Sequence, residues 1–275
     1  MVILVPYPSA RVAVAAVILI ALLSARPSAQ EPPSVGDAAD RPGFADSPVL
    51  VGRGHLLLET GLAWEHDGHD LASVRTFTWP QVELHGGITS WLDLAVLWDG
   101  LVSARARVAD ANSRLADTTT GFDDFRLGVK VRLVQRPRFA SALIGYVNVP
   151  VGSTAFSRRY AEPFTRFAWG LPLTSRFGLA GTVDLKAVKE DDGHARAKPA
   201  GSAALNVRLA GSVDSFVGIV AEPPDYGSRP RVWAVEAGLV RAVGEKHQID
   251  VSISRRIAGD LDNWFFGAGF IRRLR

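Results

Sequence analysis

The sequence predicts an all-β fold: a transmembrane, antiparallel, up-and-down β-barrel of about twelve strands, after a cleaved N-terminal signal peptide. Three observations lead to this prediction. Apolar and polar residues alternate with a period of two through most of the chain, which is typical of strands with two different faces. The connections between these segments are long and short in turn, as in barrels of the bacterial outer membrane. An apolar run near the N-terminus has the length of a secretion signal.

Residues 1–29 have the features of that signal peptide. Arg11 precedes an apolar run at residues 12–23, and small residues follow it. A helix of about 12 residues would be only about 18 Å long, which is too short to cross the hydrocarbon core of a membrane. We therefore expect cleavage after Ala25 or Ala29.

Residues 30–52 are expected to form an extended N-terminal arm. They contain four prolines and show no amphipathic period, a composition that disfavours a helix. Two interpretations stay open at this point. In one, the arm folds into the barrel as a plug through Phe44, Val49 and Leu50; in the other, it is a loose leader.

The barrel is expected over residues 53–275. The pattern is clearest where Leu127, Val129 and Val131 alternate with Lys130 and Arg132. Segments of this kind are centred near residues 59, 79, 96, 128, 145, 168, 182, 205, 218, 236, 252 and 269. Strands of about 9–12 residues can cross a bilayer at a tilt, whereas strands in soluble proteins are usually about 5–6 residues long.

Alternation of apolar and polar residues is also compatible with a soluble β-sandwich. The lengths of the connections distinguish a membrane barrel from that alternative. Long connections are expected at residues 66–73, 101–121, 152–163, 189–199, 222–230 and 257–263. Compact turns are expected at residues 86–90, 135–138, 174–176, 211–214 and 243–246. Outer-membrane barrels have short periplasmic turns, longer external loops and an even number of strands. The same architecture explains the aromatic residues near strand ends as girdles at the membrane surface, although core packing would also place them there.

Charged side chains of both signs lie on the face opposite to the aliphatic row. In a membrane barrel this polar face lines the lumen, and the apolar face contacts lipid. We expect the following side chains to face the lumen: Glu59, Glu83, Asp93, Asp124, Arg126, Lys130, Arg132, Asp184, Lys186, Arg208, Glu236 and Asp250. Pairing across strands is their expected main role, and lining a narrow channel is the other.

Several short motifs, taken in order, resemble one family. They lie at residues 40–44, 47–48 and 52–55 before the first strand, then at 80–89, 121–130, 150–152 and 247–250. Over residues 40–275 their order and spacing are similar to those of the outer-membrane proteins labelled "MetA-pathway of phenol degradation". The resemblance implies an outer-membrane barrel that transports small organic compounds. The chain ends in Arg272, Arg273, Leu274 and Arg275, whereas such barrels often end in an aromatic residue that the barrel-assembly machinery reads.

The predicted function is therefore passive passage of a small hydrophobic or aromatic compound, with no enzyme activity, metal or cofactor. Expected partners are outer-membrane lipid, the barrel-assembly machinery and a small-molecule solute. A net charge of +3 gives no reason to expect nucleic acid, and the absence of cysteine excludes thiolate chemistry. Two alternatives remain: a closed barrel that acts structurally or binds through its external loops at 101–121 and 189–199, and an outer-membrane hydrolase.

Two groups of residues are candidates for a chemical site. Residues 65–70 contain two histidines and three carboxylates, which suit a divalent ion, but a solvated loop is the favoured interpretation. His55 and His85 lie near Glu59 and Glu83, as a hydrolase would need. No serine has a convincing partner, and no nucleophile elbow is present.

Overall fold

The computed structural model describes residues 33–69, 72–109, 114–189, 194–222, 232–258 and 262–274. The expected signal peptide and both cleavage sites lie outside these residues. Among the described residues no helix is both long and apolar enough to span a membrane.

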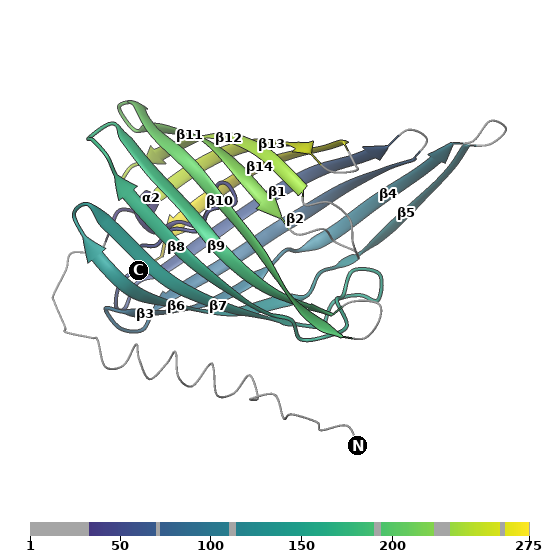
Figure 1. The fold of residues 1–275 in the computed structure, drawn as a ribbon, viewed down its shortest axis with the longest axis horizontal. Coiled ribbons are helices and arrows are strands. Elements are labelled where there is room, and N and C mark those ends of the chain that lie inside the picture. The colour runs from purple at the N-terminus through teal and green to yellow at the C-terminus, as the bar shows by residue number, and fades with distance from the viewer. Residues whose placement is uncertain are drawn as a thin grey trace, which may run out of the picture. The chain divides into compact units, whose positions relative to one another are not determined.

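The described residues form one short helical turn and a sheet of fourteen β segments (Figure 1). The turn is α2 (Val35–Ala38). The β segments are β1 (Leu56–His69), β2 (Ala72–Gly87), β3 (Leu92–Trp98), β4 (Leu101–Ala109), β5 (Arg114–Phe122), β6 (Phe125–Arg136), β7 (Phe139–Val149), β8 (Pro163–Pro172), β9 (Phe177–Lys189), β10 (Ala195–Ala210), β11 (Val213–Glu222), β12 (Val232–Val243), β13 (His247–Ala258) and β14 (Asp262–Arg273).

The fourteen segments make twelve barrel strands, because two strands are interrupted. β3 and β4 pair with successive halves of β2, so they are one strand with a break at residues 99–100. β6 pairs with β3, and β5 pairs with β4, so β5 and β6 are likewise one strand with a break at residues 123–124. β1 pairs with both β2 and β14, which closes the barrel. The predicted closed antiparallel barrel of twelve strands is confirmed.

The two faces of each strand differ in the sense expected for a membrane barrel. On β3, Asp93 is fully buried while Leu94 is 46% exposed. On β13, Asp250 is 4% exposed while Val251 is 51% exposed. A soluble sandwich would bury the aliphatic residues instead. The outer surface is thus an apolar band suited to lipid, and the polar face is turned into the barrel.

The predicted external loop at residues 101–121 is wrong, because β4 and β5 form a long hairpin there. It projects at the upper right of Figure 1, at the end opposite to α2. β2 gives β4 a backbone partner as far as Val108, and β1 runs beside β2 over the same stretch. The predicted long connection at 66–73 is wrong for a similar reason, since β1 runs to His69 and β2 begins at Ala72. Many of the residues expected in these two loops therefore belong to strands.

The arm also departs from the expected extended conformation, because α2 forms one helical turn at Val35–Ala38. The side chain of Ser34 accepts a hydrogen bond from the backbone N–H of Asp37 and so caps the turn. The C-terminal residues of β14 and the start of β1 lie at the same end of the barrel as α2. This is the end with the compact turns, which is the periplasmic end in barrels of this kind.

Candidate functional site

The N-terminal arm lies inside the barrel. Its backbone and side chains contact polar groups on β1, β2, β3, β6, β8, β12 and β13. These strands lie all the way around a closed sheet, and only a segment in the lumen can reach all of them. This placement agrees with the first of the two interpretations of residues 30–52, in which the arm enters the lumen.

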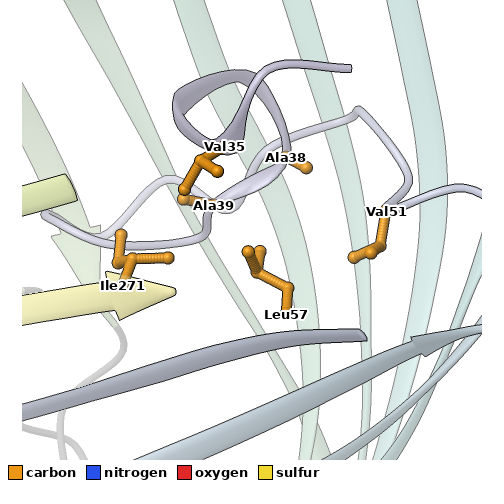
Figure 2. Packing of buried hydrophobic residues seen from close by; sticks show 6 residues of the cluster. All are labelled: Val35, Ala38, Ala39, Val51, Leu57 and Ile271. Atoms are coloured by element: carbon orange, nitrogen blue, oxygen red, sulfur yellow. The ribbon is translucent and has the colours of Figure 1, made fainter. Parts of the chain in front are cut away.

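The base of the arm packs on the barrel wall through apolar side chains. Figure 2 shows Val35, Ala38, Ala39 and Val51 against Leu57 of β1 and Ile271 of β14. Val49 packs beside this cluster, and Leu50 is fully buried. Val49 therefore makes the apolar contact expected of it, at the compact-turn end of the barrel, and Leu50 is buried.

The middle of the arm is held by buried charges. The ammonium group of Lys130 lies 2.8 Å from both carboxylate oxygens of Asp40. Glu59 accepts the backbone N–H groups of Asp40 and Arg41, each at 2.9 Å. Lys130, Asp40 and Glu59 are all buried. A buried charge is tolerated when it is paired in this way.

Further contacts follow the arm across the lumen. Asp46 pairs with Arg166, which also binds Asp184. Glu236 accepts the backbone N–H of Phe44 at 3.1 Å. The remaining anchors are Asp93, which accepts the N–H of Val51 at 2.7 Å, and Gln81 and Asp250, which lie 3.0 Å and 3.5 Å from the guanidinium of Arg41.

The twelve polar residues singled out from the sequence fall into three groups. Five contact the arm directly: Glu59, Asp93, Lys130, Glu236 and Asp250. Two reach it through a neighbour, Asp184 through Arg166 and Glu83 through His85. The other five lie elsewhere: Asp124, Arg126, Lys186, Arg132 and Arg208.

Those last five residues lie on the barrel wall or at its ends, away from the arm. Asp124 is buried and accepts the backbone N–H groups of Gly152 and Arg158, so it ties down the connection between β7 and β8. Arg126 pairs with Asp99, and Lys186 pairs with Glu222. Arg132 is half-buried. Arg208 is 66% exposed near a compact turn, 3.6 Å from Asp214.

Sequence reasoning missed the aromatic residues that face the lumen. Phe44 of the arm lies 6.1 Å from Phe265 of β14, centroid to centroid. Tyr146 of β7 stacks on Phe164 of β8 at 5.4 Å. The ring of Phe216 on β11 is close enough to Gly43 that a Cβ there would lie 3.1 Å from it. We call Phe44, Tyr146, Phe164, Phe216 and Phe265 the aromatic waist.

A sequence signal for the waist exists, but it is weak. Phe265 shares strand phase with Asn263, Gly267 and Gly269, and Asn263 is bonded to lumen-facing carboxylates. The phase of β14 thus marks Phe265 as inward and Phe266 as outward. The arm partners Asp40, Arg41 and Asp46 carry no such signal, because an irregular segment has no strand phase.

Within the described residues, the possible ligands of the cluster at residues 65–70 do not converge on one site. Glu65 and Asp67 bind Asn263 inside the barrel, whereas His66 stacks on Trp64 outside it. The side chains of His69 and Asp70 lie outside the described residues. Strand alternation therefore separates the possible ligands of residues 65–67 onto opposite faces of the wall.

A second group of possible ligands comprises Asp40, Glu83 and His85, whose ligand atoms all lie within 4.8 Å of one another. Lys130 already supplies a positive charge to Asp40, and His85 is bonded to Glu83, so each carboxylate of this cluster has a partner from the chain itself. Nε2 of His85 lies 2.6 Å from Glu83, and in the described part of the chain its Nδ1 has no hydrogen-bond partner. The arrangement is an ion-pair network, and among the described residues no serine is bonded to His85, as a hydrolase triad would require.

Comparison with known proteins agrees with this architecture. An outer-membrane channel from Pseudomonas putida F1 is similar with a TM-score of 0.62 and 10% identity, over 85% of this chain and 100% of that one. The transport unit of the autotransporter AIDA-I from Escherichia coli has a TM-score of 0.51 and 9% identity, over 97% and 99% of the two chains. The CymD monoaromatic hydrocarbon channel has a TM-score of 0.47 and 9% identity, over 80% and 88%. No curated protein matches the chain.

The first two of these likenesses concern the fold alone. The closed barrel with its apolar outer band belongs in a bacterial outer membrane. The family resemblance seen in the sequence motifs is confirmed, because a family match extends over residues 39–274. That range includes most of the arm and every strand of the barrel. The chain belongs to the family described as "Putative MetA-pathway of phenol degradation".

Proposed function

We propose that this barrel is a passive, cofactor-free channel for small hydrophobic or aromatic organic compounds. The aromatic waist is the observation that carries the proposal. Five rings line the interior of the barrel, beside buried polar side chains and small or aliphatic ones. Planar solutes stack well on such rings, either offset or edge to face. The family's description, which refers to phenol degradation, also points to an aromatic compound.

The charge arrangement supports a neutral solute. Inside the barrel, Asp40, Glu59, Asp46 and Asp184 are engaged by Lys130, Arg166 or backbone N–H groups. Charges that are already paired attract free ions weakly, so we do not expect strong ion selectivity. Outer-membrane lipid and a small solute are the partners that the proposal requires. That the barrel-assembly machinery recognises residues 272–275 stays a prediction.

The test is uptake by cells that express the protein, compared with matched cells that do not. Initial uptake of radiolabelled toluene and of glycerol is measured for the native protein and for Phe265→Ala. An aromatic contact contributes about 0.5–1.5 kcal/mol, so the ratio of toluene to glycerol uptake should fall by roughly 2- to 10-fold. The native protein should raise toluene uptake above that of the matched cells.

The control is Phe270→Ala, which removes a ring from the outward face of the same strand. It should leave the uptake ratio unchanged. Equal uptake with and without the protein would contradict the channel and favour a closed barrel with a structural or surface-binding role. Hydrolysis of an added ester by the purified protein would favour the hydrolase instead.

A further inference from the structure

Three outward-facing arginines lie on the long-hairpin side of the barrel. They lie just beyond a group of outward-facing aromatic residues, Trp64, Phe77 and Trp79, which we call the aromatic belt. β2 carries one extra residue opposite the step from Gly61 to Ala63 of β1. Because of this irregularity, the outward row of β2 passes from Leu84 to Trp79, Phe77 and Arg75. Trp79 is 54% exposed and Phe77 is 44% exposed, as lipid-facing residues would be in the absence of lipid. Arg75 follows on the same face, about 7 Å beyond Phe77.

The cross-strand register extends this arrangement over three neighbouring strands. His66 of β1 is paired in register with Arg75 of β2, and Arg75 with Arg105 of β4. Arg107 lies two residues beyond Arg105 on the same face. Two residues closer to the membrane-spanning part of these strands, the outward pair on β1 and β2 is Trp64 and Phe77. We call Arg75, Arg105 and Arg107 the outer arginine cluster.

The cluster lacks an anionic partner within the part of the chain that the structure describes. All three arginines are exposed, and none has an ion pair or side-chain hydrogen bond there. Arg75 and Arg105 are direct cross-strand neighbours, and like charges in that relation are destabilising. On β5 the residue paired with Arg105 is Thr118, which offers a hydroxyl group. Such an arrangement is stabilised when an anion binds between the guanidinium groups.

We propose that the outer arginine cluster binds the phosphate groups of the glycolipid in the outer leaflet. The cluster lies beyond the aromatic belt, where lipid headgroups begin, and on the side opposite to the compact periplasmic turns. Guanidinium groups bind phosphate through paired, charge-assisted hydrogen bonds. The acyl chains of the same lipid would cover the exposed Trp79, Phe77 and Leu101. The site is on the outer wall, so it does not depend on what passes through the lumen.

The test uses the purified full-length protein in detergent and native mass spectrometry. It is titrated with bisphosphorylated lipid A and with the same lipid after removal of both phosphates. The native protein should bind the phosphorylated form about tenfold more tightly. The triple variant R75Q/R105Q/R107Q should bind both forms equally. The matched control is R241Q, an exposed outward arginine at the compact-turn end, which should keep the native preference.

Two further measurements keep the result unambiguous. A heat-dependent shift in gel mobility verifies that each variant is a folded barrel. Inorganic phosphate at millimolar concentration is added as a competitor. Lipid A binding should persist, because the acyl chains of lipid A also contact the aromatic belt and the free ion has no such chains. Equal binding of both lipids by the native protein, an unchanged preference in the triple variant, or complete displacement by inorganic phosphate would each overturn the proposal.

Discussion

Individual charges in this barrel differ greatly in importance, according to their burial. Lys130 is 2% exposed and its ammonium group contacts both oxygens of Asp40. Arg208 is mostly exposed and lies 3.6 Å from an exposed Asp214. Removing one partner of a buried pair leaves a charge without compensation in a poorly solvated site. Removing one partner of an exposed pair changes little, because water replaces it.

Lys130→Met is therefore expected to loosen the arm strongly, with a local loss of about 3–5 kcal/mol. Arg208→Gln should change stability by less than about 1 kcal/mol. Cleavage before Asp46 by endoproteinase Asp-N reports the release of the arm, because this residue is only partly exposed when the arm is docked.

The double variant Asp40→Asn with Lys130→Met completes this experiment. It removes both charges, so it should recover part of the protection that Lys130→Met loses. Equal cleavage rates in the native protein and in Lys130→Met would show that the arm does not depend on this pair.

At the scale of elements, the break between β3 and β4 depends on Gly100. Its φ is +86°, a conformation that side chains disfavour. A Cβ at this position would also overlap the backbone carbonyl of Pro80 on β2. Gly244 likewise has a positive φ, +66°, but a Cβ added there would meet no heavy atom within 4 Å.

The two glycines separate backbone strain from a steric clash. Gly244→Ala should destabilise the barrel by about 1 kcal/mol through the positive φ alone. Gly100→Ala should cost at least about 1–3 kcal/mol more, because β2 and β4 must move apart. The midpoint of urea unfolding, followed by gel mobility, measures both. Equal midpoints for the two variants would show that the close approach to Pro80 is unimportant.

The elements also show what a sequence can predict in such a protein. Strands such as β6 and β13 are predicted well, because lipid and lumen impose opposite demands on alternate residues. The hairpin of β4 and β5 is predicted as a loop, because outside the membrane its outward face carries arginines and threonines instead of aliphatic residues. The contacts of Asp40 and Asp46 could not be predicted, since each depends on strands far away in the chain.

At the scale of the whole molecule, the arm and the barrel form one packed unit. The arm occupies the compact-turn end of the lumen, where its apolar base contacts β1 and β14 and its charged middle reaches β6 and β8. The aromatic waist lies beside the tip of the arm. A solute that passes the waist meets the arm next, so we expect passage to require displacement of the arm.

A reversible cross-link tests this expectation without background, because the chain contains no cysteine. A Cβ at Gly170 of β8 would lie 3.3 Å from Cγ of Pro48 in the arm, so the arm and β8 are in contact at this point. A disulfide needs two Cβ atoms about 3.5–4.5 Å apart. In the variant Pro48→Cys with Gly170→Cys, oxidation should lower single-channel conductance and toluene uptake, and reduction should restore both. The variant with Pro48→Cys alone controls for the oxidant. Equal transport in the oxidised and reduced states would mean that solutes pass beside a fixed arm, in which case the waist and the arm together would define the width of the channel.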